Sequence, residues 1–473
     1  MYKTVVGLEI HCELNTKTKM FSPSKNEYTI HPNRNISVID LAFPGILPLP
    51  NKEAIKKTLK LALALNCQTP DEVLFDRKNY YYADLPKGYQ ITQMTKPFGR
   101  NGYLLVDVDG VEKKFTIHQI HLEEDSASLD HFDNYSLIDY NRAGKSLVEI
   151  VTDPVFSNEK EVILFLESLR NIIKYTDVSN ASSDKGELRV DVNISMMKDT
   201  DTELGTRAEI KNINSFNSVK ETILYEIERQ KEILMSGGKV KQETRRWDDT
   251  NKVTVSMREK VEAIDYKYYV EPNIPSVKIT EKFIKEIKES IPVLPYDREK
   301  KYISLGVPVK DAKTLSKQKE ISDFYEEVLN LGTNPKEASN WMTTRLLGYL
   351  NQNNLEINKI YLKPEMLHDL VNLIETGKIS SQQGKEVFTL ILEEKKTPLE
   401  IIKEKGMEQI SDPSEIRKIV NEVIDENPTQ LETYKSGKTN ILGFFVGQIL
   451  KKSGGKANPS LVNQILNEEI NKR

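Results

Sequence analysis

The chain has 473 residues, 38% of them hydrophobic and 29% charged, and a formal net charge of −4. This length predicts about three domains of roughly 150 residues each, and no run approaches the roughly 18 apolar residues that a membrane span needs. The N-terminus enters a strand pattern at once, without a signal or transit segment, so we expect a cytoplasmic protein that does not contact a membrane. Cys12 and Cys67 are the only cysteines, which excludes a disulfide framework or a four-thiolate zinc site and predicts two buried core residues.

The first strand pattern, residues 8–14, alternates apolar residues with Glu9, His11 and Glu13. On a β-strand, a period of two turns the apolar side chains to one face and the ionisable ones to the other. Two carboxylates about 4 Å apart repel by roughly 4 kcal/mol at an effective dielectric constant near 20. Such a face therefore favours a bound cation or a shared proton. The alternative is an ordinary solvated face of an antiparallel strand.

Two later strand patterns carry further acids. Residues 117–125 end in three consecutive acids, and residues 147–151 place Glu149 inside an otherwise apolar strand. A carboxylate in that setting is costly to bury unless it is paired or bound to a metal. If these strands are neighbours, one oxygen-rich site with a single imidazole can form from Glu9, His11, Glu124 and Glu149. A site of that type suits Mg²⁺ or Mn²⁺ better than zinc.

The pattern of elements predicts a change of architecture along the chain. Residues 1 to roughly 290 are rich in short alternating strands and turn signals, with Asp109-Gly110 as a strong hairpin signal and helical patterns at 52–65, 159–175 and 218–235. We interpret this region as an α+β domain with a mostly antiparallel sheet. Amphipathic helices follow, and a final helical unit opens at residues 411–413. The predicted domains are therefore residues 1–292, 293–408 and 409–473.

Three further segments carry polar patterns. Residues 76–90 interleave cations such as Lys78 with tyrosines, which is typical either of base stacking with phosphate neutralisation or of a strand turn that covers a core. Two strand patterns alternate cations and acids on one face, and they carry Arg189, Asp191, Glu209 and Lys211. A ladder of this kind is often only a solvated face, but beside an acidic metal site it is also typical of a phosphate clamp.

The C-terminal region contains a local basic cluster. The net charge argues against a broadly basic surface, but charges are screened over about 8 Å at physiological salt, so local clustering decides nucleic-acid binding. No acidic residue occurs from Thr433 to Asn467, where the lysines are Lys435, Lys438, Lys451, Lys452 and Lys456. The alternative interpretation is a solvated helical face.

Several long motifs together resemble one family: residues 7–11, 76–90, 121–125, 139–144, 243–247 and 265–272. Over essentially its whole length, the chain resembles the B subunits of the aspartyl/glutamyl-tRNA amidotransferases. The resemblance implies a cradle-shaped catalytic domain, a helical domain and a small tail domain similar to the YqeY family. It also implies a heterotrimer with an amidase-type A subunit, which releases ammonia from glutamine, and a small C subunit.

The resemblance also implies a reaction. ATP and Mg²⁺ would be used to phosphorylate the side-chain carboxylate of Glu or Asp misacylated on tRNA(Gln) or tRNA(Asn), and ammonia would then displace phosphate. This fits the residues, because a carboxylate oxygen is a poor leaving group until it is phosphorylated, and the transferred phosphoryl group needs a metal and cations. Carried over by position, the catalytic and metal-binding set is Glu9, His11, Glu124 and Glu149, and the cofactor-binding set is Lys78, Arg189, Asp191, Glu209 and Lys211. The acid-free stretch, strengthened by the resemblance, predicts a tRNA-binding set of Lys435, Lys438, Lys451, Lys452 and Lys456.

The chain departs from the family pattern after the first strand. Many relatives carry four cysteines there that form a zinc site, whereas the aligned positions in this chain read Ser22, Ser24, Ser37 and Asp40. We therefore do not expect zinc, and we expect this loop to be held by packing alone.

Two other function classes stay open at this stage. A scaffold that only presents tRNA to the A subunit would gain nothing from Glu149 in an apolar strand. A metal-dependent nuclease or phosphatase of another class would use a similar acidic cluster but would not need the C-terminal tail.

Overall fold

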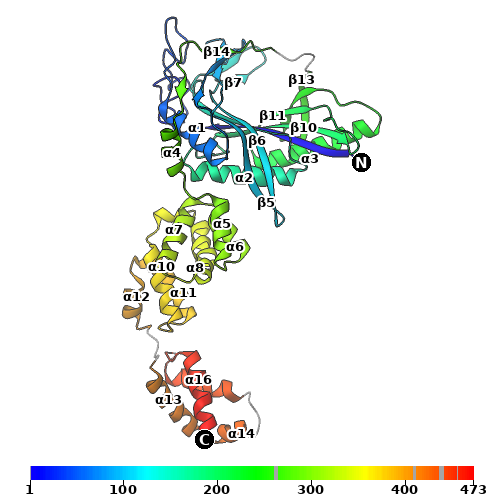
Figure 1. Cartoon of the computed structure of the whole chain (residues 1–473). Coiled ribbons are helices and arrows are strands. Elements are labelled where there is room, and N and C mark those ends of the chain that lie inside the picture. Colours follow the sequence, from blue (N-terminus) through cyan, green and yellow to red (C-terminus); the bar gives the residue numbers. More distant parts are fainter. Residues whose placement is uncertain (1, 260–264, 408–411, 436–440, 455) are drawn as a thin grey trace. The chain divides into compact units, whose positions relative to one another are not determined.

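The computed structural model describes residues 2–259, 265–407, 412–435, 441–454 and 456–473 (Figure 1). The chain divides into two compact units, Met1–Asp297 and Arg298–Arg473. The first unit combines strands and helices, and the described part of the second is helical. The predicted α+β class with a following helical region is confirmed.

A large sheet is the centre of the first unit. Among the described residues it has eight strands in the order β13-β12-β11-β10-β1-β9-β6-β5, and neighbouring strands are antiparallel except for the parallel pair β11 and β12. The bounds are β1 (Tyr2–Glu13), β5 (Gly99–Val108), β6 (Val111–Glu124), β9 (Ser146–Thr152), β10 (Leu188–Lys198), β11 (Ala208–Ile213), β12 (Glu243–Asp248) and β13 (Val253–Glu259).

The hairpin between β5 and β6 follows its sequence signal. Its turn residues Asp109 and Gly110 have φ angles of 56° and 83°. Two successive left-handed residues are typical of the tight turn that matches the twist of a two-stranded ribbon. The predicted hairpin is therefore confirmed.

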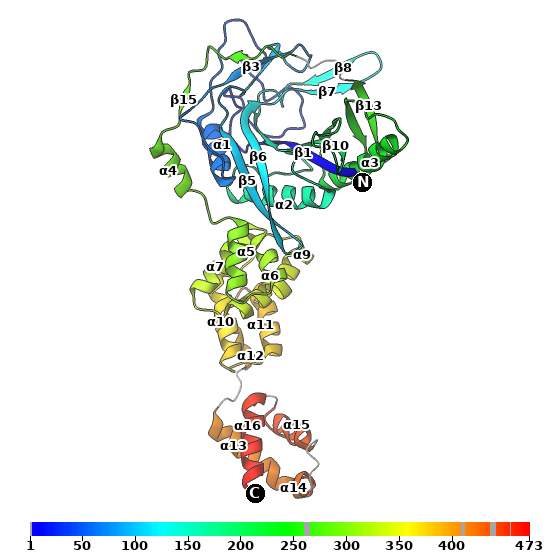
Figure 2. The ribbon, with the colours of Figure 1, turned by 45° about the vertical axis from the view of Figure 1, so that its right-hand side comes forward.

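Helices α1 (Lys52–Ala64), α2 (Glu159–Tyr175) and α3 (Phe216–Met235) cover one face of the large sheet (Figures 1 and 2). Their bounds lie within two residues of the predicted helices. Each helix begins at a polar residue whose side chain accepts a hydrogen bond from a first-turn backbone amide, which stabilises the helix end: Asn51, Asn158 and Ser215.

The apolar side chains of β1 point to these helices and belong to the core of the unit. Val6, Leu8, Ile10 and Cys12 are at most 1% exposed. Cys67 is also buried and free, so the prediction of two buried core cysteines is confirmed. Because side chains alternate along a strand, the ionisable residues of β1 lie on the opposite face of the sheet.

Three small sheets complete this unit. They are formed by β3 (Asp76–Asn79), β4 (Tyr89–Thr92) and β14 (Tyr269–Val270), by β2 (Glu72–Val73) and β15 (Val277–Lys278), and by β7 (Ser128–His131) and β8 (Ser136–Asp139). Figure 2 shows β3 and β7 on the side of the large sheet that α2 and α3 leave open. Helix α4 (Glu281–Glu289) follows β15.

The second unit contains two separate hydrophobic cores, one drawn from residues 302–402 and the other from residues 416–470. Its elements are α5 (Pro295–Ser304, which begins before the division), α6 (Val309–Ser316), α7 (Lys319–Asn330), α8 (Pro335–Trp341), the π-helix η1 (Met342–Leu346), α9 (Leu347–Asn353), the 3₁₀ helix η2 (Ile357–Lys359), α10 (Pro364–Glu375), α11 (Ser381–Glu394), α12 (Pro398–Lys405), α13 (Pro413–Glu426), α14 (Pro428–Lys435), α15 (Leu442–Lys452) and α16 (Pro459–Lys472).

The predicted domain boundaries stay predictions. The boundary at residue 292 lies five residues before the end of the first unit, because 297 − 292 = 5. The boundary at residue 408 lies outside the described residues. In the part of the chain that the structure describes, no helix combines the length and the apolar character that crossing a membrane requires.

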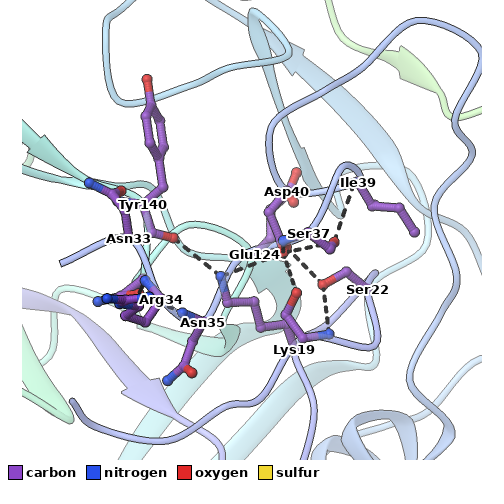
Figure 3. A network of polar contacts seen from close by, with 12 residues as sticks. Lys19, Ser22, Asn33, Arg34, Asn35, Ser37, Ile39, Asp40, Glu124 and Tyr140 are labelled. Carbon is purple, nitrogen blue, oxygen red and sulfur yellow. Dashed lines mark hydrogen bonds and ion pairs between the residues drawn. The ribbon is translucent and has the colours of Figure 1, made fainter. Parts of the chain in front are cut away.

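The loop after β1 is organised around the carboxylate of Asp40 (Figure 3). The hydroxyl groups of Ser22, Ser24 and Ser37 donate hydrogen bonds to it over 2.8, 2.5 and 3.0 Å. The backbone amide of Ser37 donates a further one over 2.8 Å. The expectation that packing alone holds this loop is therefore wrong, because one buried carboxylate joins the three serines.

A buried lysine completes this network. The side chain of Lys19 is fully buried, and its Nζ lies 3.8 Å from Oδ2 of Asp40 and donates to the carbonyl oxygen of Tyr140 over 3.2 Å. Burial lowers the pKa of Lys19 to about 8, although the charge of Asp40 acts to raise it.

This pKa predicts a pH dependence of stability. Between pH 8 and the ordinary lysine value of 10.5, the unfolded chain keeps the proton of Lys19 while the folded chain releases it. The contribution of Lys19 to the free energy of unfolding should therefore rise with pH across this window. In Lys19→Met this contribution is absent, so denaturant unfolding at several pH values should show a flatter profile than in the wild type.

The matched control is Lys25→Met, because Lys25 lies in the same loop with an exposed side chain. Its profile should follow that of the wild type. Identical profiles for Lys19→Met and the wild type would contradict the prediction.

Candidate active site

The register of the large sheet gathers ionisable residues on its open face. Glu9 of β1 stands opposite Asp191 of β10, and His11 stands between Arg189 of β10 and Glu149 of β9. The next strand, β6, places His121 opposite Glu149. The structure thus brings three of the four residues of the predicted metal-binding set, Glu9, His11 and Glu149, onto one face.

A first cluster forms from His11, Glu123 and Glu149, whose potential ligand atoms all lie within 4.8 Å of one another. The Nε2 atom of His11 is 3.6 Å from Oε1 of Glu149 and 3.9 Å from Oε1 of Glu123. Nδ1 of His121 lies 3.1 Å from the other oxygen of Glu149, and the hydroxyl group of Thr92 donates to Glu123 over 2.8 Å.

The two carboxylates of this cluster differ in their proton affinity. Burial raises the pKa of Glu123, and the charge of Glu149 raises it further. Burial also acts on Glu149, but the hydrogen bond from His121 and the charges of His11 and Lys78 outweigh it and lower the pKa of Glu149. A divalent cation would stabilise both carboxylates in their ionised form, because it supplies the positive charge that this pair lacks.

A second cluster forms beside the first from Glu9, Asp191 and Glu209, again within 4.8 Å of one another. The Nζ atom of Lys211 lies 3.3 Å from Asp191 and 2.9 Å from Glu209, and Asn193 donates to Glu9 over 3.0 Å. Burial raises the pKa of Glu9, followed by the charges of Glu149 and Asp191. Glu9 and His11 lie two residues apart on the same face of β1, so the two clusters are neighbours.

The structure separates Glu124 from both clusters. Glu123 and His121 share a face of β6, and Glu124 must point to the other face because consecutive residues of a strand alternate. Its carboxylate accepts hydrogen bonds from the ammonium group of Lys87 and, over 2.9 Å, from the backbone amide of Ile91. The expectation that Glu124 joins the metal-binding set is therefore wrong in this structure, and Glu123 takes that place.

Sequence reasoning missed Glu123 and His121 although a signal was present. His121 and Glu123 are two residues apart, so their side chains lie on the same face of a strand. His118 and Asp153 form a separate pair, with 3.5 Å between their nearest side-chain atoms. His118 and His121 therefore pair with different carboxylates.

Two of the predicted cofactor-binding cations lie near the first cluster in different ways. Arg189 pairs with Asp125 over 2.7 Å. Lys78 has no hydrogen bond or ion pair among the described residues, and its ammonium group lies 4.9 Å from the ring centre of Tyr266 and 5.8 Å from that of Tyr80. Its charge acts on Glu123 and Glu149, so Lys78 is a cation beside the first cluster that can bind an anionic ligand.

The predicted tRNA-binding lysines lie in the last helices. Lys452 pairs with Glu422 over 3.1 Å and Glu426 over 2.6 Å, and Lys435 donates to the carbonyl oxygen of the C-terminal residue. Lys451 and Lys456 are exposed and have no ion pair within the described ranges. Lys438 lies outside the described residues.

The comparisons with known proteins agree with this arrangement. Residues 4–285 match the family described as the GatB/GatE catalytic domain, and residues 323–470 match the family described as the GatB domain. The B subunit of the aspartyl/glutamyl-tRNA(Asn/Gln) amidotransferase of Halalkalibacterium halodurans is 47% identical over 474 residues, which cover 100% of both chains. The chain belongs to this family of amidotransferase B subunits.

Relatives of the same name from Geobacillus thermodenitrificans and Geobacillus kaustophilus share the same identity and coverage with the chain. The resemblance stated from the sequence motifs is therefore confirmed over the full length. The GatB/GatE catalytic match covers the open face with both acidic clusters. Both acidic clusters of the large sheet therefore lie within the residues that match the catalytic-domain family.

The separation of Glu123 and Glu124 predicts opposite outcomes for two neighbouring substitutions. Glu123→Gln should weaken the binding of Mn²⁺ by about tenfold or more, because even residues that only support a metal ligand commonly contribute 10- to 100-fold. Glu124→Gln keeps the size and the position on the same strand and should leave Mn²⁺ affinity unchanged. Calorimetric titration of both variants with Mn²⁺ measures this difference, and a larger loss in Glu124→Gln would contradict the assignment.

Proposed function

We propose that this chain is the subunit of a tRNA-dependent amidotransferase that phosphorylates the amino-acid side chain of misacylated tRNA. The γ-phosphoryl group of ATP is transferred to the side-chain carboxylate of Glu on tRNA(Gln) or Asp on tRNA(Asn), which gives an acyl phosphate and ADP. Ammonia then attacks the acyl carbon, phosphate leaves, and the side chain becomes an amide. The observation that carries this proposal is the pair of acidic clusters on one sheet face of a chain whose relatives are named as amidotransferase B subunits.

The donor sets fit magnesium. The first cluster offers two carboxylates and one imidazole, and the second offers three carboxylates, which are the oxygen-rich surroundings that hard divalent cations prefer. We assign His11, Glu123 and Glu149 to one Mg²⁺ site and Glu9, Asp191 and Glu209 to a second. Magnesium there supplies stabilisation of the negative charge on the phosphoryl oxygens.

The cations of the chain complete the site. Lys211 lies between Asp191 and Glu209 and neutralises part of their charge, which lets phosphate oxygens approach the acids. Lys78 has no ionic partner in the described part of the chain, and its charge acts on Glu123 and Glu149 of the first cluster. We assign it to the substrate carboxylate and to the phosphoryl group that arrives there.

Two partner subunits follow from this reaction. No glutamine-hydrolysing motif is present in the chain, so ammonia comes from an amidase-type A subunit, with a small C subunit completing a cytoplasmic heterotrimer. The catalytic domain spans residues 1–292, the helical domain 293–408 and the tRNA-binding tail 409–473. Ammonia then enters the open face of the sheet from the A subunit.

Co-expression of the chain with candidate A and C subunits tests the proposal. The purified complex is incubated with Glu-tRNA(Gln) or Asp-tRNA(Asn), ATP and glutamine, and the amino acid released from the tRNA is analysed. Conversion to Gln or Asn that requires ATP supports the proposal. Conversion without ATP, or none with either substrate, would overturn it.

The second cluster predicts the effect of Glu9→Gln. The substitution keeps the shape of the side chain and removes one of three charges that hold the cation, so ATP-dependent phosphorylation should fall by about 100-fold. Binding of tRNA, measured by filter retention, should be unchanged because the tail is intact. Glu286→Gln on the exposed face of α4 is the matched control, and full transamidation by Glu9→Gln would disprove the site assignment.

The tail predicts a change in salt dependence. Lys451 and Lys456 have no ionic partner among the described residues, whereas replacing Lys452 would also release Glu422 and Glu426. Removing one phosphate contact to a duplex reduces the slope of log affinity against log salt by about 0.9. The double substitution Lys451→Ala and Lys456→Ala should weaken tRNA binding and reduce this slope by up to about 1.8.

The matched control for the tail is the double substitution Lys282→Ala and Lys285→Ala on α4, whose side chains are exposed. Phosphorylation at saturating tRNA should survive in both double variants. If the tail variant keeps the wild-type tRNA affinity and salt slope, the prediction is wrong and the segment is an ordinary solvated helical face.

A further inference from the structure

Two segments that are far apart in the sequence meet beside the first acidic cluster. Strand β3 carries Lys78 and is followed by Tyr80, and the segment that leads into β14 carries Tyr266. Asn79 joins the two segments, because its backbone amide donates to the carbonyl oxygen of Tyr266 over 2.9 Å. Its side-chain amide donates to the carbonyl oxygen of Lys267 over 2.7 Å. These bonds fix the backbone of Tyr266 next to Lys78.

A local turn shapes the segment that carries Tyr266. Lys267 adopts a left-handed backbone conformation with a φ angle of 48°, and the carboxylate of Asp265 accepts a hydrogen bond from its backbone amide over 2.9 Å. An Asp side chain that binds the backbone two residues on is typical of a tight turn. Strand β14 then pairs with β3 and places Tyr269 opposite Arg77. The turn and the strand pairing together determine where the ring of Tyr266 lies.

Three tyrosine rings are in contact one after the other. The ring centres of Tyr80 and Tyr266 are 5.9 Å apart, with an angle of 71° between the ring planes. Those of Tyr266 and Tyr268 are 6.1 Å apart, with an angle of 72°. Edge-to-face pairs of this kind are a favoured arrangement of aromatic side chains. Tyr266 is the middle member, so contacts with both neighbours restrict the tilt of its ring.

The ammonium group of Lys78 lies against two of these rings. Its Nζ atom is 4.9 Å from the ring centre of Tyr266 and 5.8 Å from that of Tyr80. A cation within about 6 Å of an aromatic ring centre is attracted by the negative face of the ring. The contact with Tyr266 is the shorter of the two, so we expect it to contribute more to the position of the ammonium group.

The nearby acids do not capture Lys78. Its charge acts on Glu123 and Glu149, yet in the described part of the chain neither carboxylate forms an ion pair with it. A lysine side chain is flexible, and one that folded onto either carboxylate would be neutralised there. An aromatic face attracts an ammonium group without occupying its three N–H donors. Held by rings, Lys78 keeps its charge and its donors for an anionic ligand.

We propose that Tyr266 is a positioning residue for Lys78, whose ring holds the ammonium group beside the first acidic cluster and leaves its N–H donors to the substrate carboxylate and the phosphoryl group. This inference rests on the proposed function, in which Lys78 binds those two groups. Tyr80 supports the same contact from a greater distance, and Tyr268 keeps the ring of Tyr266 in place. Rings from two separate sequence motifs, residues 76–90 and 265–272, thereby act on one cation.

Substitutions at residue 266 in the complete complex separate the aromatic face from the hydroxyl group. Tyr266→Phe keeps the ring and should keep the wild-type kcat for ATP-dependent phosphorylation of the aminoacyl group. Tyr266→Leu keeps an apolar side chain without an aromatic face and should lower kcat by about 3- to 30-fold, the range that one cation–π contact covers. Tyr80→Leu should give a smaller loss, because its ring lies farther from the ammonium group.

A series of fluorinated rings gives a signature that a purely structural role does not produce. Phenylalanine at residue 266 is replaced by its monofluoro, difluoro and trifluoro forms, which have nearly the same shape but a progressively weaker negative face. The logarithm of kcat should fall with each added fluorine atom, because the attraction for the ammonium group weakens. Equal kcat values across the series would overturn the proposal.

A double-mutant cycle shows whether Tyr266 acts through Lys78. Tyr266→Leu should lower kcat far less in the Lys78→Met background than in the wild type, since the cation that the ring holds is absent. An equally large loss in both backgrounds would mean that Tyr266 acts on another group, and the proposal would be wrong. If Lys78→Met abolishes the reaction, the fluorinated series decides alone.

The matched control is Tyr81→Leu, because Tyr81 follows Tyr80 directly, is 96% exposed and has no ring or cation contact within the described residues. Its kcat should equal that of the wild type. If the wild-type complex is active and Tyr266→Leu has the same kcat as Tyr266→Phe, the positioning role is wrong while the proposed function stands. If the wild-type complex shows no ATP-dependent conversion of either aminoacyl-tRNA, the proposed function itself fails.

Discussion

The burial of one side of β1 determines what its other side can do. Val6, Leu8 and Ile10 are packed into the core against α1, α2 and α3, and burying each such side chain stabilises the fold by roughly 1.5–3 kcal/mol. Two carboxylates at about 4 Å repel by roughly 4 kcal/mol at an effective dielectric constant near 20. The free energy gained by burying the apolar side chains of β1 therefore exceeds the repulsion between its acids. A shift of the strand register by one residue would exchange the two faces and is excluded.

The chain relieves the crowding of its acids by different means in the two clusters. In the first cluster, His11, His121 and Lys78 surround the carboxylates, and only Glu149 has its pKa lowered. In the second, Lys211 lies between two acids while the pKa of Glu9 is raised. Each cluster thus contains a carboxylate whose raised pKa a bound cation would lower, namely Glu123 in the first and Glu9 in the second.

Periodicity predicted the fold class and the two faces of β1 well, because both depend on local alternation, whereas the predicted site took Glu124 instead of Glu123 from β6. The helices at 52–65 and 159–175 and the hairpin at Asp109-Gly110 have strong local signals and were placed within two residues. The separation into two clusters depends on which strands pair and in which register, which no local pattern contains. Asp40 illustrates the same limit, since its partners come from residues 22–37, where turn residues carry no period.

The contrast between Glu124 and its neighbour Glu123 shows how buried acids with a structural role differ from those that can bind a ligand. A carboxylate offers about four acceptor positions. Asp40 receives three hydroxyl groups and one amide, and Glu124 receives an ammonium group at both oxygens and one amide. Their acceptor positions are filled by the protein, so each acts as a cross-link.

Glu9, by comparison, accepts one side-chain hydrogen bond, from Asn193, and Glu123 accepts one from Thr92 within the part of the chain that the structure describes. Other acids, Glu149 and Asp191, also lie close to these two carboxylates, and few donors among the described residues reach their remaining lone pairs, so part of their coordination stays open. A metal ion or a phosphate-bound metal can complete it, because it brings positive charge to several of these oxygens at once. The unfilled acceptors, more than the number of acids, therefore mark this face of the sheet as the place where ligands bind.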